Sequence, residues 1–351
     1  MLKIVLVTAL VWVCGKSVII NNKTGHDVPQ CLQQNSSSPC KTLGYVFSNV
    51  SLLNNSEIVL FGNHLLHQTL TVSHVEGLTI QSGGETASII KCVNFTNGGS
   101  GLVIRFALRV KIFNIKLEGC GTSQLINNVQ YHSAVTIISS ANVQISKTSF
   151  HQSIGRGLTM HDVRGQVEVI NSSFIGNTVR DTLNDQSVHS GGGGLYIKIT
   201  PSPGDMSSCT PGPETLNDKG TMYFIMNCVF QGNTAINAEG TEESHIGFRG
   251  LTDNENGYGK GGGIYINMEG SAFLIVQDCT FYNNSALLGG GIFAIFQDST
   301  NSLYVNMCTF ENNTAPLGSG GAVQLYYDVA DPGKHNFVLL DHVQFIKNSA
   351  G

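Results

Sequence analysis

Side chains able to do acid–base or metal chemistry are few and scattered along this chain of 351 residues, which has 24 Asp and Glu and 11 His. His151, His161 and His189 do not have the spacing of metal ligands. The acidic stretch TDNENG at 252–257 misses the register of a calcium-binding loop, because Gly257 comes one residue early. We therefore assign no catalytic, cofactor-binding or metal-ligating residue from the sequence, and we expect no cofactor.

Two other patterns with catalytic potential have structural explanations. Arg109 and Lys111 are basic side chains that could act on a proton, but strand alternation places both on one outer face, which favours solvated surface. The Gly runs that begin at Gly191, Gly261 and Gly289 lack the Lys-Ser/Thr of a phosphate-binding loop and precede a strand pattern. No Ser/His/Asp set is apparent either.

Charge and composition argue against nucleic acid as a partner. Only 12% of the residues are charged, the net charge is -5, and Lys and Arg form no cluster. The hydrophobic content of 41% can supply a core, which argues against a wholly disordered chain. The 41 Gly and the many Asn, Ser and Thr residues suit stacked strands and turns.

The first fifteen residues have the features of a secretory signal peptide. Lys3 precedes an apolar run from Ile4 to Val13, and Val13-Cys14-Gly15 offers small residues near a cleavage point. The run is too short to anchor the chain in a membrane, and no later segment is long and apolar enough to cross one. We expect a secreted or extracellular protein, or the extracellular part of a larger membrane protein.

Eight cysteines follow this leader, and in an oxidising compartment some of them should pair. Cys31 and Cys40 are expected to form a clip, and Cys92 and Cys120 are a second candidate pair. The pairing of the others is left open: Cys209, Cys228, Cys279 and Cys308. Eight sequons are candidates for N-glycosylation, at Asn22, Asn35, Asn49, Asn54, Asn94, Asn171, Asn283 and Asn312.

One short pattern recurs along the second half of the chain. Aligning the copies on a Phe gives the column Phe150, Phe174, Phe230, Phe281, Phe310 and Phe345. Aliphatic or aromatic residues stand seven and five positions earlier, and a small residue, Thr, Ser, Cys or Val, stands two earlier. Three positions later the column reads Ser153, Asn177, Asn233, Asn284, Asn313 and Asn348. Cys228, Cys279 and Cys308 share one column and are expected to be buried thiols.

These columns predict a strand, a tight bend, a second short strand and a corner. Apolar residues two apart indicate a strand with one buried face. The bend falls where Asn or Asp tolerates a left-handed backbone: Asn171, Asn227, Asp278, Asn306 and Asp341. A further alternating strand begins at each Gly run. A single repeat cannot bury a core, so the copies must stack, with Asn residues forming a ladder and polar inserts leaving at corners over 178–190, 201–220 and 236–260.

The predicted fold is an all-β, right-handed parallel β-helix solenoid with a short N-terminal capping helix. The motif F-x-x-N followed by GG(A/G)(I/V) resembles the repeat of polymorphic outer membrane proteins and related right-handed β-helix proteins of the pectin lyase-like superfamily. We expect a cap segment at 16–50, with a helix over Lys41–Val50, and β-helix repeats over 51–351. The last copy stops at its first Gly, so we expect the array to be truncated at Gly351.

The fold alone leaves the function open, because β-helices serve as lyases, hydrolases, adhesins and scaffolds. The favoured hypothesis is a secreted, non-catalytic scaffold or adhesion protein whose loops meet a carbohydrate or an extracellular protein. The alternative is an extracellular polysaccharide lyase or glycoside hydrolase whose acids gather only in the folded chain. A cluster of three carboxylates in one groove would favour that alternative.

Overall fold

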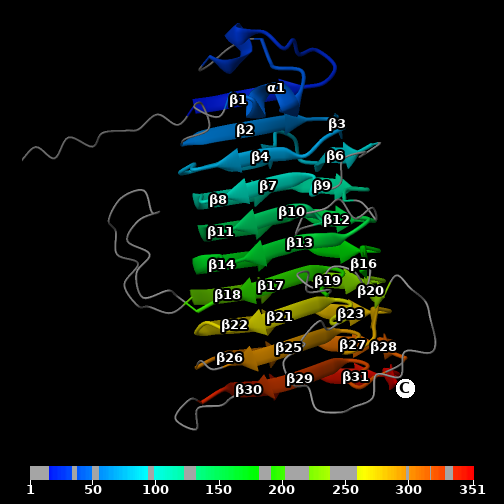
Figure 1. The fold of residues 1–351 in the computed structure, drawn as a ribbon. Coiled ribbons are helices and arrows are strands. Elements are labelled where there is room, and N and C mark those ends of the chain that lie inside the picture. The colour runs from blue at the N-terminus through cyan, green and yellow to red at the C-terminus, as the bar shows by residue number, and fades with distance from the viewer. Residues whose placement is uncertain are drawn as a thin grey trace, which may run out of the picture.

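The protein is a solenoid of short strands stacked along one axis, seen here in a computed structural model (Figure 1). The structure describes residues 16–33, 38–49, 55–93, 99–121, 132–181, 191–201, 221–237, 259–297, 300–316, 318–328 and 335–351. Within these ranges the strands form four sheets, and every pairing between them is parallel. The all-β parallel β-helix predicted from the repeat is therefore confirmed.

Two sheets carry the repeating strand–bend–strand unit. Sheet A consists of β1 (Lys16–Asn21), β2 (Ser56–Phe61), β5 (Thr79–Ser82), β8 (Leu108–Phe113), β11 (Ala141–Ser146), β14 (Arg164–Ile170), β18 (Thr221–Met226), β22 (Ala272–Gln277), β26 (Ser302–Asn306) and β30 (Phe337–Asp341). Sheet B consists of β3 (Asn63–Leu66), β6 (Ser88–Cys92), β9 (Ile115–Glu118), β12 (Ser149–His151), β15 (Ser173–Ile175), β19 (Val229–Gln231), β23 (Thr280–Tyr282), β27 (Thr309–Glu311) and β31 (Gln344–Ile346).

The other two sheets complete each turn of the coil. Sheet C consists of β4 (Leu70–Ser73), β7 (Leu102–Arg105), β10 (Ser133–Ile138), β13 (Arg156–His161), β17 (Leu195–Ile199), β21 (Ile264–Met268), β25 (Ile292–Gln297) and β29 (Val323–Asp328). Sheet D is narrower and consists of β16 (Thr178–Asp181), β20 (Thr234–Asn237), β24 (Ser285–Ala286), β28 (Thr314–Ala315) and β32 (Ser349–Ala350).

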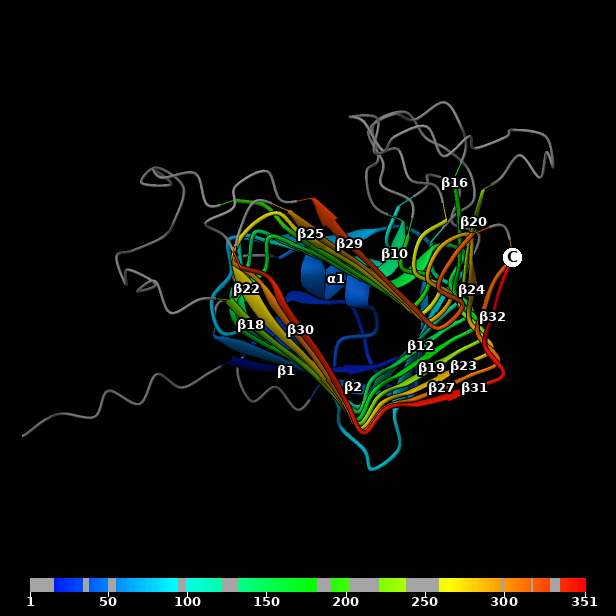
Figure 2. The same cartoon turned by 90° about the horizontal axis from the view of Figure 1, so that it is seen from below.

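The coil is right-handed, as expected from the preference for right-handed crossovers. Figure 2 views it from below, the end at which β30 lies, and the chain runs from β30 through β31 to β32 anticlockwise as it advances toward the viewer. Each full rung therefore visits sheets A, B, D and C in turn. The strand β1, inside the segment expected to form the cap, already pairs with β2 in sheet A.

The predicted Phe column fills the interior. Phe150, Phe174, Phe230, Phe281 and Phe310 are fully buried, and successive rings stack with centroids 4.5–4.8 Å apart. The ring spacing matches the distance between paired strands, so identical side chains can stack without a change of rotamer. Burying each ring contributes on the order of 1.5–3 kcal/mol to folding.

The predicted Asn ladder is also present. In each step the side-chain Nδ2 of one ladder residue donates to the Oδ1 of the next, at 2.9–3.0 Å, along Asn177, Asn233, Asn284, Asn313 and Asn348. The same Nδ2 atoms also donate to a Phe carbonyl of the preceding rung, as from Asn284 to Phe230 at 2.9 Å. Four of these side chains are fully buried. The ladder thus satisfies buried amides that water cannot reach.

The bend between sheets A and B always falls three residues before the Phe. Three predicted residues there are left-handed, with φ of 51–53°: Asn171, Asn227 and Asp278. The prediction for Asn306 and Asp341 was wrong, because these residues end β26 and β30. The left-handed residues in those rungs are the next ones, Met307 and His342. Position in the rung sets the bend, even where the residue is not one that favours this conformation.

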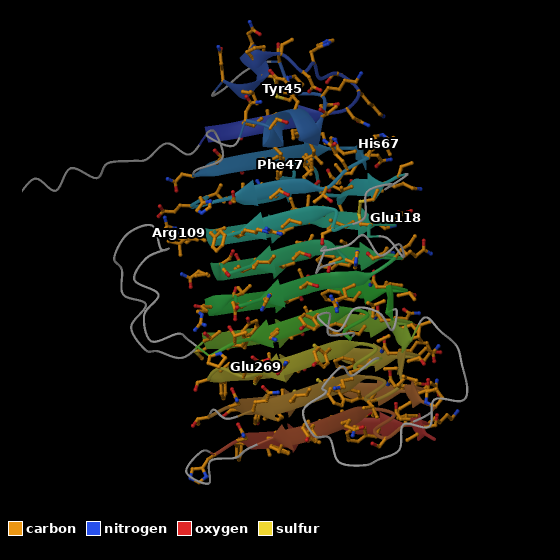
Figure 3. The ribbon with its side chains drawn as sticks, viewed as in Figure 1. Tyr45, Phe47, His67, Arg109, Glu118 and Glu269 are labelled. Atoms are coloured by element: carbon orange, nitrogen blue, oxygen red, sulfur yellow. A yellow bond between two sulfur atoms is a disulfide. The ribbon has the colours of Figure 1, made fainter. Side chains whose placement is uncertain are left out.

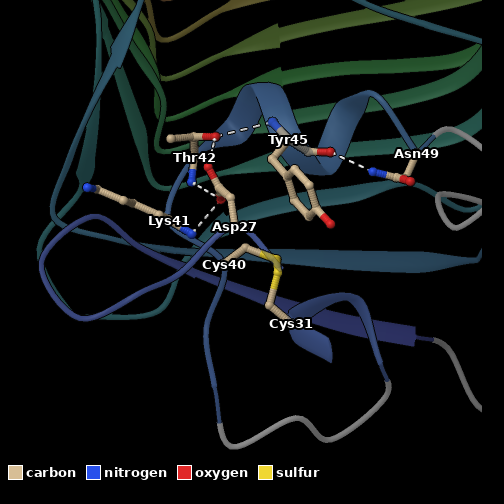
Figure 4. Close-up of a disulfide and its surroundings, with 7 residues drawn as sticks. All are labelled: Asp27, Cys31, Cys40, Lys41, Thr42, Tyr45 and Asn49. Atoms are coloured by element: carbon tan, nitrogen blue, oxygen red, sulfur yellow. Dashed lines mark hydrogen bonds between the residues drawn. A yellow bond between two sulfur atoms is a disulfide. The ribbon is translucent and has the colours of Figure 1, made fainter. Parts of the chain in front are cut away.

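The N-terminal cap is a short helix over the first rungs, shown in Figure 4. α1 spans Leu43–Phe47, shorter than the helix expected over Lys41–Val50. It begins after Thr42, whose Oγ1 accepts a hydrogen bond from the Tyr45 amide at 3.2 Å. Asp27 accepts from the amides of Lys41 and Thr42 at 2.9 Å and so ties the preceding loop to this start.

Two disulfides fasten the N-terminal rungs. Cys31 in the short 3-10 helix η1 (Pro29–Leu32) is bonded to Cys40, as Figure 4 shows. Cys92 is bonded to Cys120 across two successive rungs, with their Cα atoms 4.8 Å apart. A crosslink of this kind limits the conformations of the unfolded chain.

The three column cysteines remain thiols. Cys228, Cys279 and Cys308 are free and buried, in agreement with the sequence-based expectation. Burial raises the pKa of the Cys279 thiol well above its usual value, and its Sγ donates to the carbonyl of Gln277. The buried Cys279 thiol therefore behaves as a small apolar side chain inside the coil.

A histidine is buried near the cap. His64 on β3 points into the coil and is 3% exposed, and its Nε2 has no hydrogen-bond partner among the described residues. Burial lowers the pKa of His64, because a charged imidazolium would lose its hydration there.

The ladder generates a first prediction. Replacing Asn284 with Ala removes the bonds to Asn233 and Asn313 and leaves both amides short of a buried partner. We expect a loss of about 1–3 kcal/mol in the free energy of unfolding, measured by urea titration. Tyr282→Ala and Glu311→Ala on the outer surface serve as controls and should cost much less. Equal losses for all three variants would contradict the ladder's role.

His64 generates a second prediction. Its folded-state pKa lies below the ordinary 6.5, so the unfolded chain binds the proton more readily. The stabilisation by neutral His64 is therefore complete above about pH 6.5 and declines as the pH falls below it. We expect His64→Leu to make the free energy of unfolding less dependent on pH in this range, whereas Leu65→Ala, at an exposed position of the same strand, should not. An unchanged slope in His64→Leu would exclude His64 as a source of the acid sensitivity.

Candidate functional site

The outer face of sheet C carries a column of aromatic rings. Tyr196, Tyr265 and Phe293 occupy one register position on β17, β21 and β25. Their rings stack at centroid distances of 5.1 and 5.8 Å, and each side chain is at most 3% exposed. The strands after the Gly runs were expected to alternate between buried and solvated residues. This was wrong for these three strands, which are buried on both faces for most of their length.

Two cations lie over this aromatic column. The Arg156 guanidinium is 4.4 Å from the centroid of Tyr196, and Lys260 Nζ is 5.2 Å from that of Phe293. Arg156 also donates through Nε to the Gly191 carbonyl at 2.7 Å. A cation over an aromatic face is attracted by the ring quadrupole, more strongly where water is excluded. The aromatic column and its two cations therefore form a closely packed layer on the outer face of sheet C, which we call the floor.

The Gly run allows successive rungs to pack closely against the interior Phe column. A Cβ added to Gly263 would come within 2.6 Å of the Gly291 carbonyl oxygen and 2.9 Å of the Phe281 ring. Any side chain there would push two rungs apart, so only Gly fits. This supports the structural interpretation of the run.

A polar cluster stands beside the floor, where sheet C turns toward sheet A. We call His161, Asp162, Lys198, Asn267 and Glu269 the corner cluster. Its members come from three successive rungs. His161 on β13, Lys198 on β17 and Asn267 on β21 share one register column. Lys198 Nζ lies 3.0 Å from Glu269 Oε1, and Asn267 Nδ2 donates to the same oxygen at 3.1 Å. Figure 3 marks Glu269 in this part of the coil.

The second carboxylate of the corner cluster is also engaged. Asp162 Oδ1 accepts from the Thr200 amide at 2.8 Å and from its hydroxyl at 2.6 Å. Asp162 Oδ2 lies 3.4 Å from His161 Nε2. Burial lowers the pKa of His161, and the negative charge of Asp162 opposes that shift. At neutral pH, His161 is thus expected to be mainly uncharged.

The corner cluster keeps a limited contact with solvent. The side chains of His161, Asp162, Lys198 and Glu269 are 16–22% exposed. Asn267 is fully buried, and its Oδ1 has no hydrogen-bond partner among the described residues. The cluster therefore offers a fixed ammonium, two fixed carboxylates and an amide. Such groups can bind hydroxyls, and a neutral imidazole can accept a proton.

Sequence reasoning missed this cluster. His161 was considered and set aside, because the members stand at irregular intervals and form no motif. The available signal was the alignment of the Gly-initiated strands, since His161, Lys198 and Asn267 are equivalent positions in it. The His189 and TDNENG positions lie outside the described residues. Among the described ranges, no three His, Cys, Asp or Glu side chains are placed to hold a metal ion.

A second ionic group lies on the outer face of sheet B. Glu118 lies 3.0 Å from Lys116 and 3.6 Å from Lys91, and the hydrogen bond from Lys116 is the main cause of its lowered pKa. Arg109 and Lys111 are exposed on β8, as expected, and Arg109 pairs with Glu76. Arg109 and Glu118 appear toward opposite edges of the coil in Figure 3, so these groups do not form one site.

The described sequon asparagines occupy two kinds of position. Asn171, Asn283 and Asn312 lie at corners of the coil with left-handed backbones. Asn22 and Asn49 lie near the cap, where their amides are hydrogen-bonded. Asn35, Asn54 and Asn94 lie outside the described residues, as does Cys209.

In the described part of the chain, no helix is long and apolar enough to cross a membrane.

Comparison with known proteins agrees with the repeat. The model of the Chlamydia polymorphic membrane protein repeat matches residues 278–295 and 307–325. No curated protein sequence matches. Similar solved structures include jun a 1, the major allergen from cedar pollen, with 14% identity over 95% of this chain and 77% of that chain and a TM-score of 0.41.

Two further solved structures are enzymes. A pectate lyase from Bacillus sp. N165 in complex with trigalacturonate is 12% identical over 96% of this chain and 84% of that one, with a TM-score of 0.40. A rhamnogalacturonan lyase is 10% identical over 90% and 87%, with a TM-score of 0.40. The sheets of this chain themselves show a right-handed parallel β-helix, and its rungs are similar to the polymorphic membrane protein repeat.

Proposed function

We propose that the chain is an extracellular, non-catalytic β-helix scaffold that binds carbohydrate at the corner cluster. The signal peptide expected over 1–15 and the two disulfides favour an oxidising compartment outside the cytosol. The coil supplies a rigid support on which outer residues can vary without disturbing the interior. Function therefore depends on what the outer face presents.

The observation that carries the proposal is the corner cluster itself. Lys198 and Glu269 are partly exposed and are fixed by contacts between neighbouring rungs. The buried column at Tyr196 and Tyr265 holds their strands in place from the same face. Sugar hydroxyls donate and accept hydrogen bonds at once, so a paired ammonium and carboxylate suit them. Fixed groups also bind with less loss of side-chain entropy than mobile ones.

The alternative is a polysaccharide lyase or glycoside hydrolase. The corner cluster favours it to the extent that two carboxylates, a lysine and a histidine meet on one surface. The existing bonds argue against it. Lys198 is held in an ion pair with Glu269, and Asp162 is committed to Thr200. Groups engaged in this way are better suited to holding a ligand than to exchanging protons with it.

Binding is tested by placing the purified full chain on a glycan array, with calcium and with a chelator. We expect binding to a defined set of glycans. We expect Lys198→Ala to weaken it on the order of 10-fold or more, since a hydrogen bond to a charged group contributes about 1.5–3 kcal/mol. Lys116→Ala, which removes a similar ion pair on sheet B, is the matched control and should bind normally.

The same proteins are then assayed for polysaccharide cleavage by the ultraviolet absorbance of unsaturated products and by the release of reducing ends. No cleavage, together with glycan binding that depends on Lys198, would support the proposed function. Turnover that Lys198→Ala or Asp162→Asn abolishes would favour the enzyme instead. A chain that binds no glycan on the array would contradict the proposal.

A further inference from the structure

The corner between sheets B and D is built from a pair of asparagines with opposite environments. Asn283 and Asn312 have left-handed backbones with φ of 53°; Asn283 is exposed and Asn312 is partly exposed. The next residues, Asn284 and Asn313, are fully buried members of the ladder. One step along the chain thus separates an amide that solvent can reach from one that it cannot.

The sequence around these pairs makes only the outer asparagine a substrate for N-glycosylation. The sequon requires Ser or Thr two positions after the Asn. Asn283 meets this requirement through Ser285, and Asn312 through Thr314. Every ladder residue instead has Ser or Thr one position later and Ala or Val two positions later, as at Asn177, Asn233, Asn284, Asn313 and Asn348. The repeat therefore keeps its buried amides out of the modification sequence.

A third accessible sequon lies at the other edge of sheet B. Asn171 is exposed at the bend between sheets A and B, with φ of 51°. The sequons near the cap differ, because each amide nitrogen already donates one of its two hydrogens to a backbone carbonyl, which fixes the side chain against the protein. Asn49 Nδ2 donates to the Tyr45 carbonyl at 2.8 Å, and Asn22 Nδ2 donates to the carbonyl of Asn63. The Oδ1 of Asn22 is buried as well.

We propose that Asn171, Asn283 and Asn312 carry N-linked glycans and that these flank sheet B, leaving the corner cluster uncovered. Figure 2 shows why: the two corners that bound sheet B lie away from the corner at which sheet C turns into sheet A. In this step, a bond forms between the Asn Nδ2 and the anomeric carbon of an oligosaccharide. The bond from that carbon to the diphosphate oxygen of a lipid carrier breaks, and the lipid diphosphate leaves with the bonding electron pair. The amide nitrogen loses one proton, which passes to the leaving diphosphate or to solvent. The inference rests on the extracellular location in the proposed function.

The sites are mapped on the full chain expressed in eukaryotic cells, with its own first fifteen residues and with a standard secretory leader in their place. Peptide N-glycosidase treatment converts each glycosylated Asn to Asp, and mass spectrometry then identifies the positions. We expect conversion at Asn171, Asn283 and Asn312, and none at Asn22 or Asn49. Total cell lysate is analysed together with the medium, so that a retained protein also gives a result.

Matched variants connect each glycan to its corner. Asn283→Gly and Asn312→Gly copy Gly176 and Gly232, which occupy the same corner position with φ of 65° and 60°. Each should lose one glycan without a change in unfolding temperature, measured after deglycosylation. Asn49→Asp should leave the number of glycans unchanged.

Unmodified Asn283 and Asn312 with either leader would overturn the inference, and so would a glycan at Asn22 or Asn49. The outcome of the glycan-array experiment does not depend on the outcome of the glycosylation mapping. Sites occupied as proposed on a chain that binds no glycan would refute the carbohydrate-binding function alone. Unoccupied sites on a chain that binds would refute only the inference.

Discussion

Stacking between rungs in fixed register is the constraint on which the rest of this structure depends. A strand in the coil bonds only to its equivalents in the rungs above and below, so no rung can fold alone. Each buried side chain must then tolerate a copy of itself about 4.8 Å away. Phe meets this condition by stacking its ring. Asn meets it by donating from one amide to the next, as in the step from Asn233 to Asn284.

The same constraint gives the two faces of each strand different roles, because inward residues build the coil and outward residues can carry function. Inward positions are held to a few residue types, whereas outward positions and corners are free to vary. The corner cluster exploits this freedom, because its register column reads His161, Lys198 and Asn267 on three rungs that share the same aliphatic interior. The corners proposed to carry glycans do so too, since Asn283 replaces the Gly found at that position in an earlier rung. Surface chemistry can thus change while the coil remains intact.

The sequence predicted the features that recur in every rung and missed features that do not recur. The Phe and Asn columns were predictable because each rung needs them. The bend was misplaced at Asn306 and Asp341, because residue type was used where position in the rung decides. The capping helix is shorter than expected, because Thr42 caps its start and the side chains of Ser48 and Asn49 bond the carbonyls of its last turn. The corner cluster was missed because inserts of unequal length hide the register that brings its residues together.

Deleting one rung tests the register requirement most directly. Phe281 and Phe310 are equivalent residues of adjacent rungs, whose ladder residues are 29 positions apart. Removal of 281–309 should therefore join identical columns and give a chain that unfolds cooperatively in urea, with strand content retained by circular dichroism. Removal of 281–308 leaves one extra residue, which turns the following strand's inner face outward, and should abolish cooperative unfolding. Equal behaviour of the two deletions would contradict the claim that register between rungs specifies this fold.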